Sequence, residues 1–84
     1  MPDEWEKVSF VVSGSVRAKA LRALDSPMTP TRLAKELKID RPSASRALLE
    51  LEGQGLVACL TPEARKGRLY RRTALGNRVL KHAD

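Results

Sequence analysis

Residues 41–53 place small polar side chains and long cationic donors near the start of one predicted helix. Ser43 and Ser45 alternate there with other residues, and Arg41 and Arg46 supply the donors. A guanidinium can donate two hydrogen bonds to guanine O6 and N7, and small side chains let a helix backbone enter the major groove. The pattern predicts base reading, with Arg46 as the best candidate. The alternative for Arg46 is a solvated side chain or a phosphate contact.

A second group of cations lies in a predicted hairpin loop over about residues 61–68. Arg65, Lys66 and Arg68 lie at or beside the tip, and Gly67 permits the turn. Loops with this charge contact the phosphate backbone or reach into a minor groove. The loop is therefore a candidate clamp on a duplex.

The start of another predicted helix is a candidate phosphate site. Thr29 and Pro30 are typical of an N-cap and a first helical position. The N–H groups that follow are free and lie at the positive end of the helix dipole, which favours an anion. The Thr31 hydroxyl and the Arg32 guanidinium could add to such a site.

Hydrophobic spacing and turn residues predict the elements that position these side chains. Alternating β-branched and aromatic residues favour an opening strand, whereas apolar residues at helical spacing favour helices. We expect one domain over residues 1–84, of α+β class and mostly α, with an N-terminal tail at residues 1–7. The expected elements are a strand at 8–12, helices at about 14–24, 29–37 and 40–54, strands at 56–60 and 68–73, and a helix at 73–82.

Composition supports a nucleic-acid partner and excludes several other classes. The 84 residues carry a net charge of +6, and the strongest positive excess lies in residues 61–84. Cys59 and His82 are the only cysteine and histidine, so no metal cluster can form from them within one chain. There is no supported catalytic triad and no glycine-rich cofactor loop. We expect neither an enzyme nor a cofactor-binding or metal-binding protein.

The sequence also indicates a cytoplasmic location. A single cysteine cannot form an internal disulfide, which fits a reducing compartment. The first seven residues, MPDEWEK, are polar and acidic, unlike a signal peptide. No apolar run approaches the roughly 18 residues needed to cross a bilayer, so no membrane partner is expected.

Four segments resemble winged helix-turn-helix transcription regulators. Residues 45–57, SRALLELEGQGLV, resemble the segment from recognition helix to wing in that group. Residues 67–76, GRLYRRTALG, resemble its return strand and the start of its last helix. Residues 8–17, VSFVVSGSVR, and 59–63, CLTPE, are similar to a small archaeal branch related to the ArsR and MarR groups. The resemblance covers about residues 8–82.

This resemblance implies a short N-terminal strand, a three-helix core, a β-hairpin wing and a C-terminal helix. It implies that Ser43, Ser45 and Arg46 lie over the major groove, and that the wing is formed by Arg65, Lys66 and Arg68. One position departs from the pattern, since related proteins usually place a leucine where this chain has Arg72. A buried arginine is costly unless it is paired. Either the strand is more exposed here, or Arg72 binds DNA or an acidic partner.

Two further residues have more than one interpretation. Arg17 falls within the apolar arc of its predicted helix. It is either a snorkelling or ion-paired side chain, or it contacts a DNA phosphate or a second protomer. Trp5 is the only tryptophan, and it either packs with the first strand at a dimer interface or covers the core of its own domain.

The leading hypothesis is a sequence-specific regulator that binds double-stranded DNA as a homodimer. Residues 41–53 would enter the major groove, and the wing at about 61–68 would lie on the flanking backbone or minor groove. Two alternatives remain open. One is a winged-helix protein-interaction module in a transcription assembly, and the other is a nonspecific, chromatin-like DNA-binding protein.

Overall fold

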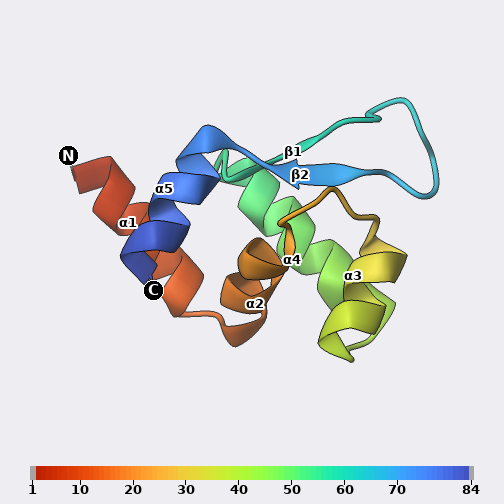
Figure 1. Cartoon of the computed structure of the whole chain (residues 1–84), viewed down its shortest axis with the longest axis horizontal. Helices are drawn as coiled ribbons and strands as arrows, with labels where there is room; N and C mark the ends of the chain where they lie inside the picture. Colours follow the sequence, from red (N-terminus) through yellow and green to blue (C-terminus); the bar gives the residue numbers. More distant parts are fainter. Residues whose placement is uncertain (1, 84) are drawn as a thin grey trace.

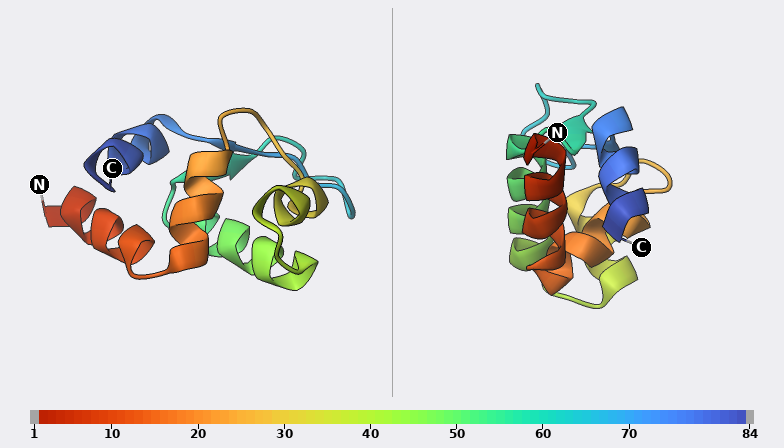
Figure 2. Two further views of the ribbon diagram at one scale, coloured as in Figure 1. Left: turned by 60° about the horizontal axis from the view of Figure 1, so that its bottom comes forward. Right: turned by 90° about the vertical axis from the view of Figure 1, so that its left-hand side faces the viewer.

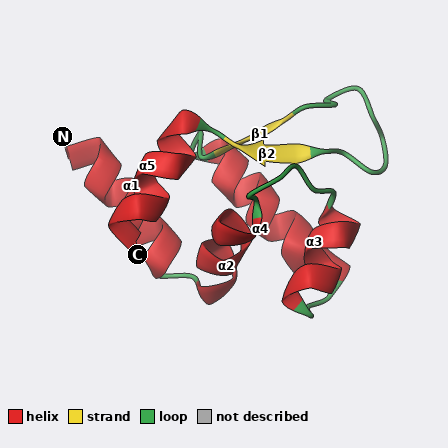
Figure 3. Cartoon of the chain, in the orientation of Figure 1, coloured by secondary structure: helices red, strands yellow, loops and turns green. Residues whose placement is uncertain are grey.

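Helices form most of the structure, which is a computed structural model describing residues 2–83, with side chains described from residue 4 (Figure 3). Helices α1 and α5 lie together at the end that holds both chain termini, and the loop of the β-hairpin extends at the opposite end (Figure 1). The elements are α1 (Pro2–Val12), α2 (Ser15–Ala23), α3 (Pro30–Leu37), α4 (Arg41–Gly53), β1 (Val57–Cys59), β2 (Tyr70–Arg72) and α5 (Ala74–Ala83). The predicted class, mostly helical α+β with a hairpin, is confirmed.

The strand predicted at residues 8–12 is wrong, because these residues form the second half of α1. Val8 and Val11 lie three residues apart, on one helical face, and both are buried. Because α1 packs against α5, burial of this face outweighs the modest preference of β-branched residues for strands. Residues 2–7, expected as a tail, belong to the same helix.

The hydrophobic core lies between α2, α3 and α4 and extends to the hairpin and α5. Helix α4 packs against both α2 and α3, as the predicted three-helix core requires (Figure 2). Helices α2 to α5 bury residues of the apolar faces that their spacing predicts. The largest fully buried side chains are Val11, Leu21, Leu33, Leu48, Leu51, Leu56, Val57 and Val79.

Local hydrogen bonds define the two helices of the helix-turn-helix. Thr29 Oγ1 accepts a hydrogen bond from the backbone N–H of Arg32 at 3.2 Å and caps α3, and a carboxylate oxygen of Asp40 accepts from the N–H of Ser43 at 3.0 Å and caps α4. Lys38 ends α3 with a φ of 58°, in the left-handed region. Both predicted N-caps are confirmed.

The hairpin is short, and the chain before α3 reinforces it. Val57 pairs with Arg72 and Cys59 with Tyr70 in the antiparallel register. Met28 and Tyr70 exchange backbone hydrogen bonds of 3.0 and 2.9 Å on the outer side of β2. The base of the wing is therefore held from both sides, whereas residues 61–68 form a loop with a positive φ of 65° at Gly67.

Arg72 joins the base of the wing to α2 and α5. Its Nη1 donates to the carbonyl oxygen of Leu21 at 2.8 Å, and its Nε donates to Asn77 Oδ1 at 2.6 Å. Its side chain is 16% exposed, so the more exposed strand considered from the sequence is wrong. The arginine is satisfied within the domain, because the last carbonyls of α2 carry the negative end of a helix dipole. Gly76 permits this close packing, since a Cβ there would overlap the backbone oxygen of Leu56.

Candidate nucleic-acid interface

A groove of about 270 Å³ lies between the start of α3, one side of α4 and the hairpin loop. We call it the wing groove. Four cations line it, and none of the described residues around it is acidic. The lining residues are Pro30, Thr31, Arg41, Ser45, Leu49, Arg65, Lys66, Gly67, Arg68 and Tyr70. Two segments that the sequence predicted separately, the helix-turn-helix and the basic loop, therefore form one cationic surface.

The side of α4 that faces the wing carries Arg41, Ser45 and Leu49. These residues are four apart, so they follow one another along one side of the helix. Arg41 is exposed and Ser45 is half-buried. Leu49 is 52% exposed, whereas its neighbour Leu48 is fully buried. The groove therefore has a polar and cationic wall with one apolar side chain.

Ser43 and Arg46, two of the predicted base readers, line a different hollow. This α2 hollow measures about 310 Å³ and lies between α4 and the turn that joins α1 to α2. Arg46 is exposed there. The Ser43 hydroxyl donates to Asp40 Oδ1 at 2.8 Å, so it takes part in the helix cap. Of the predicted α4 residues, Arg41 and Ser45 thus face the wing, and Ser43 and Arg46 border the α2 hollow.

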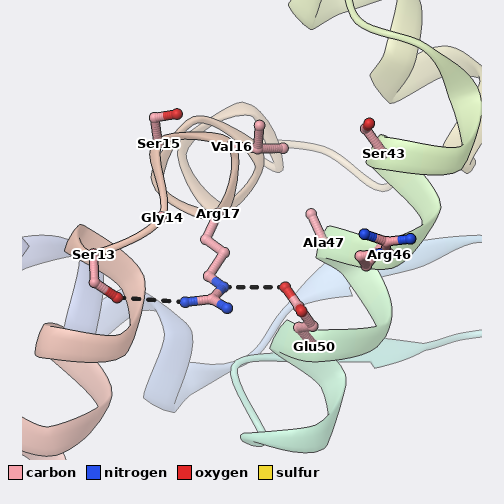
Figure 4. A pocket seen from close by; sticks show the side chains of 9 residues that line it. All are labelled: Ser13, Gly14, Ser15, Val16, Arg17, Ser43, Arg46, Ala47 and Glu50. Carbon is pink, nitrogen blue, oxygen red and sulfur yellow. Dashed lines mark hydrogen bonds and ion pairs between the residues drawn. The ribbon is translucent and has the colours of Figure 1, made fainter.

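The Arg17 side chain lines the α2 hollow and binds a residue of α4. Figure 4 shows its guanidinium between Ser13 and Glu50. Its Nε lies 3.1 Å from Glu50 Oε1, its Nη1 donates to the carbonyl oxygen of Phe10 at 3.0 Å, and its guanidinium carbon lies 4.0 Å from the centre of the Phe10 ring. The ion-pair interpretation of Arg17 is confirmed. Because Glu50 is on α4, this pair fixes that helix against the α1–α2 turn.

Of the two candidate residues at the start of α3, only Thr31 lines the wing groove. Thr31 is exposed and lines the wing groove. Arg32 is also exposed, but its Nε lies 3.3 Å from Glu36 Oε1 one turn later, and it does not line the groove. In the loop, Arg68 Nε donates to the carbonyl oxygen of Ala64 at 2.7 Å, which stiffens the loop from within.

Electrostatics near the recognition helix follow from its cap. The Ser43 hydroxyl and then the Ser43 backbone N–H donate to Asp40, and these bonds hold the pKa of that carboxyl below its ordinary value. Asp40 therefore stays ionised at neutral pH. In the groove, burial raises the pKa of the Tyr70 hydroxyl, so this side chain is neutral there.

Trp5 lies on the outer surface at the α1–α5 end. Its ring centroid is 4.8 Å from that of His82, yet the residue is 60% exposed. Glu4 accepts a hydrogen bond from Arg78 Nε at 3.1 Å, and its other oxygen is 3.1 Å from His82 Nε2. The alternative in which Trp5 covers the core of its own domain is therefore wrong.

Among the described side chains, no three His, Cys, Asp or Glu residues come together in a way that could hold a metal ion. None of the helices formed by residues 2–83 has the length and apolar character that a bilayer span requires.

The order of α3, a tight turn, α4 and a basic hairpin defines a winged helix-turn-helix domain. The chain belongs to the family described as the HVO_A0261 N-terminal domain, whose model matches residues 5–84. No curated protein gives a significant match.

Solved structures of MarR regulators share this fold. A MarR family transcription regulator has 25% identity and a TM-score of 0.72, over 82% of this chain and 48% of its own. A mutant MarR from E. coli complexed with operator DNA has 25% identity and a TM-score of 0.74, over 98% and 61%. The Multiple Antibiotic Resistance Repressor, MarR, has 26% identity and a TM-score of 0.73, over 93% and 59%.

These comparisons confirm the predicted resemblance to winged-helix regulators of the MarR group. The chain spans between 48% and 61% of the length of these three structures. The archaeal branch and the ArsR likeness stay predictions. The sequence also left Tyr70 unrecognised as a groove partner, because only the folded hairpin brings it beside α4.

Proposed function

We propose that this chain is a transcription regulator that binds double-stranded DNA, and not an enzyme. The recognition helix, residues 41–53, enters the major groove, and the wing at residues 61–68 contacts the flanking backbone or minor groove. Arg46 reads a base edge, with Ser43 and Ser45 admitting the helix to the groove. A cytoplasmic location is part of the same proposal.

The observation that carries this proposal is the wing groove. Arg41, Arg65, Lys66 and Arg68 line one surface beside a helix whose outward residues are mostly small or cationic. Phosphates of a duplex provide a matching row of negative charge. The MarR neighbours are transcription regulators, and one of them was crystallised with operator DNA, which supports the same function for this fold.

We also propose a homodimer, with α1 at its interface. Trp5 and Val12 are 60% and 54% exposed and lie on the same outward face of α1. Burial of both side chains against a second copy would remove apolar surface from water. Two protomers would then reach half-sites about one helical turn apart on the duplex. Sedimentation equilibrium tests the interface, because a Trp5→Ala dimer should dissociate at a higher protein concentration than the native dimer. A native chain that is monomeric at tens of micromolar would contradict the interface.

A binding titration across salt concentrations tests contact with DNA. If the four groove cations of a protomer neutralise about four phosphates, the logarithm of affinity should fall with a slope of about −4 against the logarithm of salt concentration. With this slope the affinity of each protomer would drop roughly 150- to 250-fold between about 50 and 200 mM salt. A flat response would contradict the proposal.

Single substitutions separate reading from clamping. Arg46→Ala should reduce the preference for a selected site over random duplex by about tenfold, because one bidentate base contact contributes roughly 1–3 kcal/mol. Lys66→Ala should weaken both duplexes alike and reduce the salt slope by about 1. Lys19→Ala, an exposed lysine on α2 outside the wing groove, is the matched control and should change neither.

The same titration tests the two alternatives. A nonspecific, chromatin-like protein would bind random and selected duplexes equally, and Arg46→Ala would change nothing beyond the loss of one charge. A protein-interaction module would show no salt-dependent DNA binding, and the exposed Leu49 is the observation that favours it.

A further inference from the structure

We propose that Leu49 reads the C5 methyl group of a thymine, and that this thymine lies one or two base pairs from the guanine read by Arg46. This inference rests on the proposed DNA-binding function and assigns a specificity-determining role to a residue outside the polar and cationic set.

The exposure of Leu49 separates it from every other leucine of α4. Leu48 and Leu51 are fully buried, but Leu49 is 52% exposed on the outward side. Exposure of an isolated leucine is common on protein surfaces and needs no explanation by itself. Its surroundings are less ordinary, since it lines a groove that also holds four cations.

The chemistry of the major groove gives such a side chain one apolar partner. Each base pair presents hydrogen-bond donors and acceptors there, and only thymine adds a methyl group. Arg41 and Ser45 precede Leu49 by eight and four residues on the same side of α4. A duplex that meets these polar residues therefore meets Leu49 on the same surface.

The spacing along α4 limits where the thymine lies. Arg46 and Leu49 are three residues apart, and Cβ atoms at that spacing are about 5–6 Å apart on a helix surface. Successive base pairs rise by about 3.4 Å. The thymine contacted by Leu49 is thus within about two base pairs of the base contacted by Arg46.

Two other uses of Leu49 make different predictions. A leucine that docks a protein partner would have no effect on DNA binding. A leucine that only supports the wing from beneath would affect all duplexes equally when shortened. Only a thymine contact predicts a loss of affinity at a single base position when one methyl group is removed from the DNA.

The experiment alters the contact first on the DNA and then on the protein. The native chain is first used to select a bound site from a random duplex pool. Each thymine of that site is then replaced in turn by deoxyuridine, which lacks only the C5 methyl. The native chain should lose about fourfold in affinity at one thymine, the effect of removing one buried carbon from an apolar contact.

Variants identify the protein side of the contact. Leu49→Ala should bind the thymine and deoxyuridine duplexes equally, whereas Leu49→Met should keep most of the difference. Leu60→Ala removes another exposed leucine, which lies outside the wing groove, and should respond to deoxyuridine like the native chain. Because Leu49 is half-exposed, its variants should retain the unfolding midpoint of the native chain within a few degrees.

Three results would overturn the inference. Equal binding of all deoxyuridine duplexes by the native chain would show that no thymine methyl is read. The same sensitivity in Leu49→Ala as in the native chain would assign the methyl contact to another residue. Absence of salt-dependent binding to any duplex would refute the proposed function as well, so the two failures are distinguishable.

Discussion

Replacement of Arg72 by leucine should lower the free energy of unfolding by about 2–3 kcal/mol. The substitution places an apolar side chain at the position and removes the guanidinium, which donates to the Leu21 carbonyl oxygen and to Asn77 Oδ1. A hydrogen bond to a charged group contributes roughly 1.5–3 kcal/mol. The side chain is 16% exposed, so we take the lower end of that range for each bond and subtract the relieved desolvation of the charge.

The contact with Asp25 adds little to this figure. Its Oδ1 lies 3.5 Å from Arg72 Nη2, and the Asp25 side chain is 86% exposed. Exposed ion pairs are screened by water and contribute close to nothing. The main loss is therefore the tie between β2, the last turn of α2 and α5.

Urea unfolding followed by circular dichroism measures the change in the free energy of unfolding, and thermal unfolding gives a second measurement. An 84-residue domain should shift its thermal midpoint downward by about 10–20 °C for a change of this size. Arg71→Leu is the matched control: it removes the same charge from the same strand, but its side chain is exposed. If the two variants differ by less than about 0.5 kcal/mol, the specific contacts of Arg72 do not stabilise the fold.

Two further predictions concern the two ends of α5. Gly76→Ala should lower the free energy of unfolding by roughly 1–3 kcal/mol, because the added methyl overlaps the Leu56 carbonyl. Gly53→Ala is the control, since its Cβ would have open space around it, and it should not lower the free energy of unfolding. Equal thermal midpoints for the two variants would contradict the packing argument. The Arg78 hydrogen bond holds the pKa of Glu4 below its ordinary value of 4.5, so the stability that Glu4 contributes is full above that value and is lost as pH falls through the folded pKa. Glu4→Gln should thus be less stable than the native chain at neutral pH, and the difference should shrink as pH falls through the folded pKa of Glu4, as measured by thermal unfolding; a difference independent of pH would contradict this assignment.

Features that depend on a few neighbouring residues could be predicted from the sequence. Thr29, Asp40 and Thr73 begin helices because a side-chain oxygen accepts a hydrogen bond from the N–H three residues later. The apolar faces of α3 and α4 follow from helical spacing alone. These signals depend on a few neighbouring residues, so they can be recognised without the tertiary structure.

The first helix could not be predicted in this way. Residues 8–12 favour a strand by local preference, and the choice of helix depends on burial of Val8 and Val11 against distant parts of the chain. Local preference for strand spans only about 1 kcal/mol per residue and is reversed by packing. An error of this kind is expected wherever a short β-branched run lies beside a long-range contact.

The candidate site shows the same division. The cationic groups were visible as sequence patterns, and most of them meet in the wing groove. The partners of Arg17 and Arg72 were not visible, because Glu50 is 33 residues from Arg17 and the Leu21 carbonyl is 51 residues from Arg72. Which cations face DNA and which hold the fold together depends on the tertiary structure.

Helix α2 acts as a spacer of fixed length between the two parts of the interface. Near its start Arg17 is bound to Glu50 of the recognition helix, and at its end the Leu21 carbonyl is bound to Arg72 at the base of the wing. The two attachment points are four residues apart, or about 6 Å along the axis. One residue inserted between them would move one attachment by about 1.5 Å and turn it by about 100°. Helix α2, which contributes no residue to the wing groove, thus helps to fix the recognition helix relative to the wing, and with it the stretch of duplex that both can contact at once.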